Sequence, residues 1–478
     1  MEYYNNLICG EPSEPRGGEY RSNSNPANLD ESIGEFPVST PDDVREAVEA
    51  ASDAFGDWAS APGPERGRIL YRFADLLRDN TEKLARALTR EEGKVIGEAR
   101  GEVKRAIAET QFMAGEASRL NGEHYASEQP DVEITRRRIP MGPIAAITPW
   151  NFPIVTPVRK ISPALAYGDT VVVKPAALTP LTALMLAELY HEAGVSPGVI
   201  NVVMGSGSAI GDVLSGSPEI RGITFTGSTS IGKRIYANSV ENLTKVQLEM
   251  GGKNPAFVYD AEDLDYAASQ IVSAAFASAG QRCTAISRVI VSEHERDELV
   301  RKLEKLVGDI RVGDPLDESI DMGPLVSESQ LETVERYVEQ ARKENAQVLV
   351  GGERARGPHD GYYYHPTLIA GIDRSSPVVL EEIFGPVLTV QTVSTFEEGI
   401  DVCNEPPYGL AGCVFTRNLA KAKAFLRTMD SGMVHVNHGT ASQPHVPFGG
   451  VKESGFGAYS IGPTAREFYM NEKVVYLK

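Results

Sequence analysis

The chain has 478 residues, of which 66 are Asp or Glu and 47 are Lys or Arg, so its formal net charge is −19. A single hydrophobic core stops growing at about 250–300 residues, so this length predicts at least two domains. The acidic balance argues against nucleic acid and against a membrane surface as partners, because both attract a basic face. A small-molecule ligand is expected instead.

The first elements are short strands followed by helices. Residues 1–40 are rich in Gly, Pro, Ser and Asn, which predicts strands and turns at the surface. Thr40 and Pro41 are typical of a helix N-terminus, and apolar residues then recur at helical spacing as far as Trp58. The same spacing predicts further helices at about 65–79, 81–92 and 98–119.

From about residue 140 the pattern changes to short apolar runs that alternate with helical stretches, which is typical of βαβ units and a parallel sheet. The runs are IAAI, TVVVK, VINVV, GITFT and KVQLE. A second series, from PAFVY through ISRVIVS, QVLVGG, GPVLTV and GCVFT to GMVHV, covers about 255–436 and predicts a second α/β domain. The polar stretch 120–140 predicts a hairpin that leaves the body, and the C-terminal FYMNEKVVYLK is expected to join it as a strand.

The cysteines and the N-terminus indicate the compartment. Cys9, Cys283, Cys403 and Cys413 are unevenly spaced and form neither a disulfide framework nor a metal-binding pattern, so no metal is expected. The N-terminus lacks the basic and apolar regions of a signal peptide, and no apolar run reaches the roughly 18 residues of a membrane helix. A cytoplasmic protein with no membrane partner is expected.

Two residues are candidates for covalent chemistry. Cys283 lies in Ala-Gly-Gln-Arg-Cys-Thr, where polar neighbours favour a nucleophile over the more common inert core cysteine. No His is placed by a motif to act as its base, which weakens the interpretation as a thiol hydrolase. Glu249 follows KVQL and precedes two glycines, a position that suits a general base, although a surface Glu before a turn is the alternative.

Two glycine-containing junctions favour a nucleotide site. The segment 205–211, with Gly207 and Gly211, follows VINVV but is one residue longer than the GxGxxG pattern. Phe225, Gly227 and Ser228 follow a strand and precede a helix expected to begin near Thr229, whose backbone N–H groups suit an anion. Any doubly wound sheet has Gly at its turns, so these junctions alone stay ambiguous.

Seven motifs in chain order resemble those of the aldehyde dehydrogenase superfamily. They are TPWNFP (148–153), KPA (174–176), FTGS (225–228), LEMGGK (248–253), GQRC (280–283), EEIFGP (381–386) and PFGG (447–450). The resemblance spans nearly the whole chain and implies an α/β fold with two doubly wound parallel-sheet domains and a small β oligomerisation arm. It implies a cofactor-binding domain at 1–119 and 141–251, a catalytic domain at 252–458 and an arm at 120–140 and 459–478, in a homodimer or homotetramer.

The resemblance also assigns catalytic roles. Cys283 matches the nucleophile that attacks the aldehyde to give a thiohemiacetal and, after hydride transfer to the nicotinamide, a thioester. Asn151 matches the side-chain donor to the oxyanion, together with the Cys283 backbone N–H. Glu249 matches the base that activates water for deacylation. Because relatives that transfer the acyl group to coenzyme A differ at this position, Glu249 favours an acid-forming enzyme.

The implied cofactor is NADP or NAD. Lys174 and Glu382 match ribose-binding residues, and Phe384 matches an aromatic residue near the nicotinamide. Many NAD-preferring relatives carry Glu where this chain has Ala177, so NADP is expected to be accepted. A further departure is Tyr459, where relatives carry a glutamate assigned to proton exit. The full expected cofactor-binding set is Trp150, Lys174, Ala177, Gly207, Gly211, Phe225, Gly227, Ser228, Glu382 and Phe384.

Arg159 and Gln281 are the expected substrate-binding residues. Arg159 lies eight residues after Asn151, on a helix with one face toward the aldehyde tunnel. Succinic semialdehyde and lactaldehyde dehydrogenases resemble this chain in having Arg there, so the guanidinium is expected to bind a substrate carboxylate; an internal salt bridge is the alternative.

The wider pattern is most similar to the 2-oxoglutarate semialdehyde (2,5-dioxopentanoate) dehydrogenases of pentose breakdown. Oxidation of succinic semialdehyde or of a broad range of aliphatic aldehydes is the alternative. Two other classes stay open: a non-catalytic member that keeps the fold, and an esterase that uses Cys283 without nucleotide.

Overall fold

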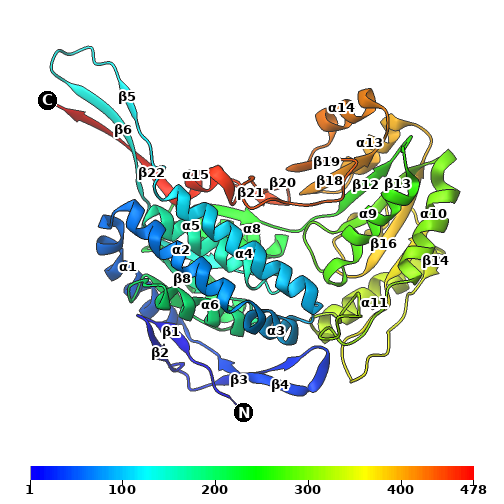
Figure 1. Ribbon diagram of the computed structural model, residues 1–478, viewed down its shortest axis with the longest axis horizontal. Helices are drawn as coiled ribbons and strands as arrows, with labels where there is room; N and C mark the ends of the chain where they lie inside the picture. Colours follow the sequence, from blue (N-terminus) through cyan, green and yellow to red (C-terminus); the bar gives the residue numbers. More distant parts are fainter. Residues whose placement is uncertain (1) are drawn as a thin grey trace.

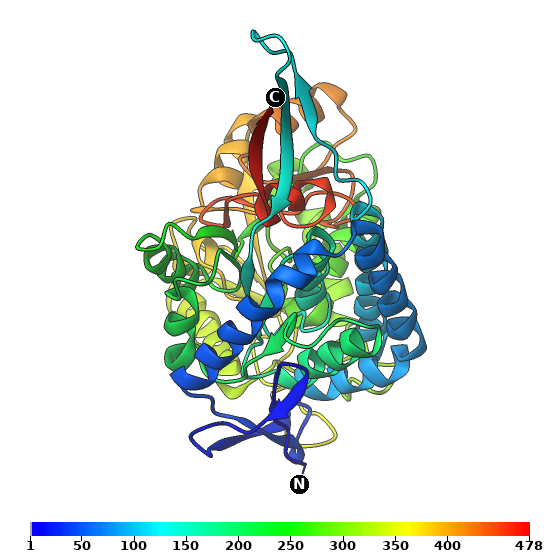
Figure 2. The same cartoon turned by 90° about the vertical axis from the view of Figure 1, so that its left-hand side faces the viewer.

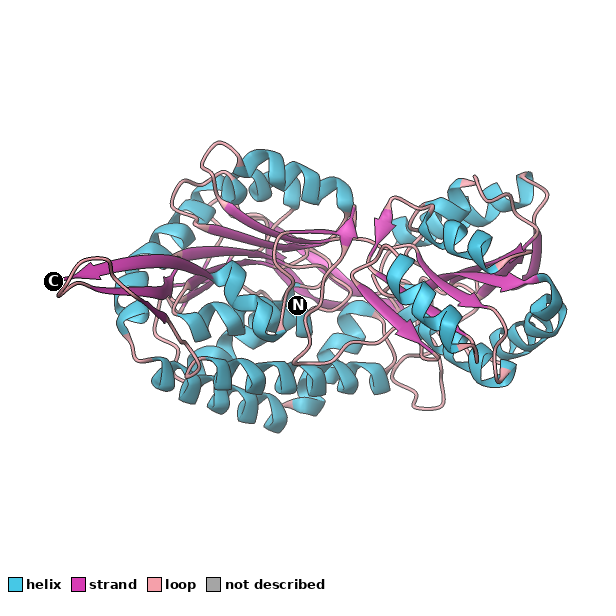
Figure 3. Ribbon diagram, turned by 90° about the horizontal axis from the view of Figure 1, so that it is seen from above, coloured by secondary structure: helices cyan, strands magenta, loops and turns pink. Residues whose placement is uncertain are grey.

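The computed structural model describes residues 2–478 and contains two large β-sheets side by side, with a β arm that projects from the first of them (Figures 1 and 3). The α/β fold with two largely parallel sheets, expected from the two series of apolar runs, is confirmed.

The first sheet has eight strands in the order β2-β1-β9-β8-β7-β10-β11-β21. Strands β7 to β11 are parallel, whereas β1, β2 and β21 run antiparallel to their neighbours. The strand order reverses between β7 and β10, and ligands of such sheets bind where the loops diverge at this point. The strands are β1 (Asn6–Ile8), β2 (Glu11–Ser13), β7 (Pro143–Ile147), β8 (Thr170–Lys174), β9 (Ile200–Val202), β10 (Gly222–Thr226), β11 (Lys245–Glu249) and β21 (Gly455–Phe456).

Helices cover both faces of this sheet. Along β8, Val171 and Val173 pack against one helix layer, and Val172 packs against the other. Both faces are buried, which explains why this strand is apolar at consecutive positions. The helices are α1 (Pro41–Ser60), α2 (Gly63–Asp79), α3 (Thr81–Glu92), α4 (Ile96–Glu116), α5 (Val155–Tyr167), α6 (Pro180–Glu192), α7 (Asp212–Ser215), α8 (Thr229–Ser239) and α15 (Ala465–Tyr469).

The second sheet has seven strands in the order β14-β15-β16-β13-β12-β18-β19, all parallel except β14. Helices cover both of its faces as well. The strands are β12 (Asn254–Val258), β13 (Ile286–Ser292), β14 (Gln347–Val350), β15 (Thr367–Ala370), β16 (Val387–Val393), β18 (Ala411–Phe415) and β19 (Met433–Val436). The helices are α9 (Leu264–Phe276), α10 (Glu293–Gly308), α11 (Glu328–Lys343), α12 (Pro377–Leu380), α13 (Phe396–Asn404) and α14 (Leu419–Thr428). A short pair, β17 (Tyr408–Gly409) and β20 (Val451–Lys452), lies beside this sheet's last loops.

The arm consists of β5 (Glu123–Tyr125), β6 (Glu133–Pro140) and β22 (Met470–Leu477). Strand β22 pairs antiparallel with β6 from Met470 opposite Pro140 to Leu477 opposite Glu133. This confirms the expected hairpin and the C-terminal strand that joins it, and Figure 2 shows the arm extending away from the body. At the other end of the molecule, β3 (Tyr20–Asn25) and β4 (Asn28–Pro37) form the N-terminal hairpin.

The expected helices at the N-terminus agree closely with α1 to α4. Strand β15, with the sequence TLIA, was not among the expected runs. The domain boundaries and the oligomerisation role of the arm stay predictions. Among residues 2–478, no helix combines the length and the apolar character required to cross a membrane.

Candidate active site

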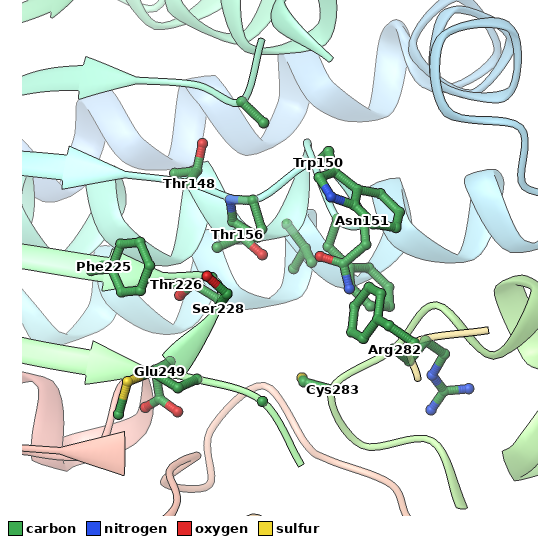
Figure 4. A pocket seen from close by; sticks show the side chains of 18 of the residues that line it. Thr148, Trp150, Asn151, Thr156, Phe225, Thr226, Ser228, Glu249, Arg282 and Cys283 are labelled. Atoms are coloured by element: carbon green, nitrogen blue, oxygen red, sulfur yellow. The ribbon is translucent and has the colours of Figure 1, made fainter. Parts of the chain in front are cut away.

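A cavity of about 1010 Å³ lies between the carboxyl ends of the first-sheet strands and the loops of the second sheet. Its walls include the loops after β7, β10 and β11, the segment 277–284 that precedes β13, and parts of α4 and α5. Figure 4 shows Asn151, Glu249 and Cys283 around this cavity, each from a different element. The structure therefore brings together three residues that lie far apart in the sequence.

Cys283 is half-buried and follows a left-handed turn after α9. In this turn Ser278, Ala279 and Gly280 have φ values of 53°, 54° and 71°. Beyond the turn, the Cys283 backbone carbonyl accepts a hydrogen bond of 2.8 Å from Asn254 Nδ2, at the start of β12. The loop of the nucleophile candidate is thus anchored to the second sheet.

The surroundings of Cys283 favour the protonated thiol. Burial, together with the carboxylates of Glu382 and Glu249, raises its pKa to about 12 against the opposing effect of Arg159 and Arg282. Because the thiolate is the attacking form, the thiol needs a proton acceptor when the substrate binds. The other three cysteines do not line the cavity: Cys9 is exposed, and Cys403 and Cys413 are buried.

Asn151 is a buried residue of the loop between β7 and α5. Its Nδ2 donates a hydrogen bond of 2.8 Å to the backbone oxygen of Gln281, which fixes the amide beside the cysteine loop and leaves its second N–H free. In the described part of the chain, the Cys283 backbone N–H has no acceptor. These two free donors are the pair expected for an oxyanion site.

Glu249 is the last residue of β11, and its side chain is buried at the cavity. Its Oε2 has no hydrogen-bond partner among residues 2–478. Burial raises the pKa of this carboxyl above its ordinary value of 4.5, against the opposing effect of the Lys160 and Arg159 cations. A buried carboxylate with a free oxygen and a raised pKa suits a general base for water.

Two charged residues, the buried Lys174 and the half-buried Glu382, line the expected nucleotide side of the cavity. Lys174, at the end of β8, donates from Nζ to the Pro175 oxygen at 3.2 Å and keeps two further N–H groups. Burial lowers the pKa of Lys174 to about 8. Glu382 accepts from the Gly252 N–H at 2.9 Å, and burial raises its pKa to about 7. Both side chains keep hydrogen-bonding capacity for hydroxyl groups such as those of a ribose.

On the rest of this side, the cavity is lined mainly by backbone N–H groups and glycines. Ser228 is the N-cap of α8 and its side chain makes no capping bond, so the first N–H groups of this helix are available to an anion. Gly227 tolerates no side chain, because a Cβ would lie 2.6 Å from the Phe225 ring. Gly207 and Gly211 line the cavity on the turn before α7. These residues fit a dinucleotide phosphate.

An aromatic pair closes the cavity between the two sheets. The rings of Trp150 and Phe384 are 5.3 Å apart at an interplanar angle of 87°, an edge-to-face contact. Phe384 has a left-handed φ of 58°. Both rings line the cavity, as expected for residues near a nicotinamide.

Two expected residues, Gln281 and Ala177, do not line the cavity, and neither does Tyr459. The side chain of Gln281 faces away from it: Oε1 accepts from the Val326 N–H at 3.0 Å, and Nε2 donates to the Ser278 oxygen at 3.3 Å. Only its backbone oxygen contributes, as the acceptor for Asn151. Ala177 is absent from the wall, although its neighbour Ala176 is part of it. The Tyr459 ring lies against Gly449.

Arg159 lines the cavity from α5 and is also ion-paired. Its Nη2 and Nε bind the two carboxylate oxygens of Glu109 at 2.8 and 3.2 Å. Arg105 binds the same carboxylate through Nε at 2.7 Å, and Phe448 lies under the Arg159 guanidinium at 4.8 Å. The internal salt bridge therefore exists, and the guanidinium still faces the site.

The sequence did not indicate one wall of the site. Lys94, Glu98, Glu102 and Arg105, in or beside α4, line the cavity, and so do Thr440 to Ser442. Charged residues at helical spacing usually lie on a solvated face, so these were not expected at a site. The only indication in the sequence was that Glu98, Glu102 and Arg105 are spaced so that they lie on one face of a helix.

Comparison with known proteins identifies the family. The model of the aldehyde dehydrogenase family matches residues 14–475. The chain is 38% identical to an alpha-ketoglutaric semialdehyde dehydrogenase of Bacillus subtilis, over 99% of this chain and 98% of that protein. It is 37% identical to a malonate-semialdehyde dehydrogenase of Bacillus velezensis, over 98% of this chain and 96% of that protein.

Similarity to solved structures supports the same family. A betaine aldehyde dehydrogenase from Staphylococcus aureus in complex with NAD+ superposes with a TM-score of 0.96 at 35% identity, covering 99% of this chain and 94% of that one. A 3,6-anhydro-L-galactose dehydrogenase in complex with NADP gives 0.97 at 35% identity, covering all of both chains.

Fold and cavity together define a nucleotide-dependent oxidoreductase. The chain belongs to the aldehyde dehydrogenase family, and it is an NAD(P)-dependent aldehyde dehydrogenase.

Proposed function

We propose that this enzyme oxidises a carboxylated semialdehyde, with 2-oxoglutarate semialdehyde as the preferred substrate, to the corresponding acid through covalent intermediates on Cys283. The observation that carries this proposal is Arg159, a guanidinium in the wall of the same cavity as Cys283. Oxidation of succinic semialdehyde or of a broad range of aliphatic aldehydes is the alternative.

The proposed reaction begins when the Cys283 thiol loses its proton to solvent and its sulfur forms a bond to the aldehyde carbon, which gives a thiohemiacetal. Asn151 Nδ2 and the Cys283 N–H donate hydrogen bonds to the oxygen as it becomes negative. When bound, the nicotinamide nucleotide accepts the hydride that leaves this carbon, so that a thioester remains on Cys283. Glu249 takes a proton from the water that attacks the thioester, and the acid and the free thiol are released.

We assign the proposed cofactor contacts to residues that line the cavity. Lys174 and Glu382 would bind ribose hydroxyls, and Gly227, Ser228 and the start of α8 would hold the diphosphate. Ala177 leaves no carboxylate near the adenosine ribose, so both NAD and NADP would be accepted.

The charge of the Arg159 cluster supports an anionic substrate. Arg105 and Arg159 share the single carboxylate of Glu109, which leaves one positive charge in excess. Glu109 uses Nε and one N–H of Nη2, while Arg159 Nη1 has no protein acceptor among residues 2–478. The Nη1/Nη2 end of the guanidinium can still give two parallel hydrogen bonds to a substrate carboxylate. In this proposal the ion pair with Glu109 orients the Arg159 guanidinium and leaves its remaining N–H groups available to the substrate.

The names of the relatives support a semialdehyde as the substrate, but the named semialdehydes differ in chain length. The two most relevant names, alpha-ketoglutaric and malonate semialdehyde, both describe an aldehyde that carries a carboxylate. Betaine aldehyde carries a quaternary ammonium group, which the excess positive charge of this cluster would repel.

We also propose the division of labour expected from the sequence: a cofactor-binding domain (1–119 and 141–251), a catalytic domain (252–458) and an oligomerisation arm (120–140 and 459–478). Val474, Tyr476 and Leu477 of β22 are exposed, and β22 is an edge strand, which supports pairing with another subunit in a homodimer or homotetramer.

Arg159→Ala tests the substrate assignment. We expect kcat/KM for 2-oxoglutarate semialdehyde and succinic semialdehyde to fall by about tenfold to a hundredfold, the equivalent of roughly 1.5–3 kcal/mol for a charged hydrogen bond. Butanal and hexanal, which carry no carboxylate, should be oxidised at nearly the wild-type rate. Glu109 keeps Arg105 as its partner at 2.7 Å, so the substitution leaves no unpaired buried carboxylate.

Arg159→Lys is the matched control, because it keeps the charge and loses the planar fork. It should retain part of the preference for semialdehydes. An equal loss for both substrate classes, or no loss for either, would show that Arg159 is structural.

A further inference from the structure

Helix α4 carries a row of acidic residues, and two of them, Glu98 and Glu102, line one wall of the cavity. Glu102 and Glu109 lie four and eleven residues after Glu98, which places all three on one face of the helix. Glu102 and Glu109 are 4% and 1% exposed, whereas Glu98 is half-buried and contacts the cysteine loop. Buried carboxylates are costly unless they are hydrogen-bonded, so each needs a specific partner.

Glu98 binds the strained turn in front of Cys283. Its two oxygens accept from the Ser278 N–H at 2.9 and 3.1 Å, and Oε2 also accepts from Ser278 Oγ at 3.2 Å. Ser278 and Ala279 both have left-handed φ values, 53° and 54°, a conformation that is unfavourable for L-residues. A carboxylate that binds the first residue of the turn stabilises this conformation.

Glu102 binds the loop that carries Asn151. Its Oε1 accepts from the Ile154 and Val155 N–H groups at 2.9 and 3.0 Å, at the start of α5. Its Oε2 binds Lys94 Nζ at 2.7 Å, and the same Nζ donates to the Asn151 backbone oxygen at 2.7 Å. One carboxylate and one ammonium group thus fix the backbone on both sides of Phe152.

The two loops also contact each other through the hydrogen bond from Asn151 Nδ2 to the Gln281 oxygen. The distance between the two proposed oxyanion donors is therefore set by two loops that approach from different sheets, and α4 is the rigid element that binds both.

We infer that Glu98 is a positioning residue for catalysis: its carboxylate holds the Ser278–Gly280 turn so that the Cys283 sulfur and backbone N–H face the Asn151 amide, and Glu102 with Lys94 does the same for the Asn151 loop. This inference rests on the proposed role of Cys283 as the nucleophile. Glu98 acts through the turn and makes no contact with the reacting atoms.

Glu98→Gln tests the inference with an isosteric side chain that keeps one acceptor oxygen. A displacement of reacting groups by about 1 Å costs up to a hundredfold in rate, so we expect kcat to fall by about tenfold for Glu98→Gln and further for Glu98→Ala. Semialdehydes and butanal should lose the same factor, and KM and the dissociation constant of the nucleotide should change little.

Ala279→Gly in the Glu98→Gln background separates positioning from a charge effect. Glycine adopts a left-handed φ without steric cost, so the double variant should recover part of the lost kcat. Glu116→Gln is the matched control, because Glu116 lies on α4 outside the cavity and pairs with Arg119 at 3.0 Å. It should keep wild-type kcat.

Wild-type kcat in Glu98→Gln and Glu98→Ala would overturn the inference, and so would a loss confined to carboxylated substrates or a double variant no better than Glu98→Gln. Cys283→Ala is assayed alongside: if it still oxidises aldehydes, the proposed function fails, whereas an inactive Cys283→Ala with fully active Glu98 variants overturns only the inference about Glu98.

Discussion

The two ends of the cavity are built differently. At the nucleotide end the wall consists largely of strand ends, glycines and the start of α8, and Ser228 makes no capping bond. At the catalytic end side chains from distant parts of the chain hold the loops: Asn151 binds residue 281, and Asn254 binds Cys283. Apart from the side chains of Lys174 and Glu382, the proposed nucleotide end depends on the course of the backbone, whereas the catalytic end depends on individual side chains.

This difference predicts where substitutions are costly. Backbone N–H groups stay in place when a nearby side chain is changed, whereas removing a side chain from the catalytic end removes the reacting group or its orientation. Single substitutions should therefore have large effects around Cys283 and small effects around the nucleotide.

The largest expected effect is that of Cys283→Ala. Without the sulfur no thiohemiacetal forms, so aldehyde oxidation should fall to the background rate, while the dissociation constant of the nucleotide stays close to wild type because the sulfur is not part of the backbone-built end. Steady-state assays and nucleotide titration measure the two properties. Cys9→Ala, at an exposed cysteine, is the control and should be fully active. Substantial turnover by Cys283→Ala would mean that another residue is the nucleophile.

Asn151→Ala should have the next largest effect. It removes one oxyanion donor and the hydrogen bond to the Gln281 oxygen, and loss of one such donor costs about 10²–10³ in kcat. Pre-steady-state measurement of the first turnover should show that acylation itself is slowed. If acylation kept its wild-type rate, the oxyanion site would have to lie elsewhere.

Ala177→Glu should have the smallest effect, and only on the choice of nucleotide. A carboxylate near the adenosine ribose repels a 2′-phosphate and offers an acceptor to a 2′-hydroxyl. We expect kcat/KM for NADP to fall by about tenfold relative to NAD, with the rate of aldehyde oxidation under saturating NAD unchanged. A wild-type enzyme that already prefers NAD a hundredfold would contradict the reasoning about Ala177.

The same contrast explains what could be predicted from the sequence. The apolar runs predicted both sheets, because a strand buried on both faces, such as β8, is apolar at consecutive positions, here Val171 to Val173. Cys283, Asn151 and Glu249 were indicated by motifs, and the structure brings them to one cavity.

The remaining features depend on contacts that spacing does not show. Glu98 and Glu102 were not predicted as site residues, since nothing in α4 alone reveals the loops that pack on it. Gln281 was expected to bind substrate, but its side-chain oxygen accepts a hydrogen bond from the Val326 N–H instead.

The central claim is that Cys283 carries an acyl group that Glu249 helps water to remove. Rapid mixing of Glu249→Gln with aldehyde and nucleotide tests it most directly, because acylation does not need the water-activating base whereas deacylation does. We predict a rapid burst of about one reduced nucleotide per subunit, followed by a steady-state rate far below that of the wild type. An equal steady-state loss without a burst, in a variant that binds nucleotide normally, would contradict the assignment.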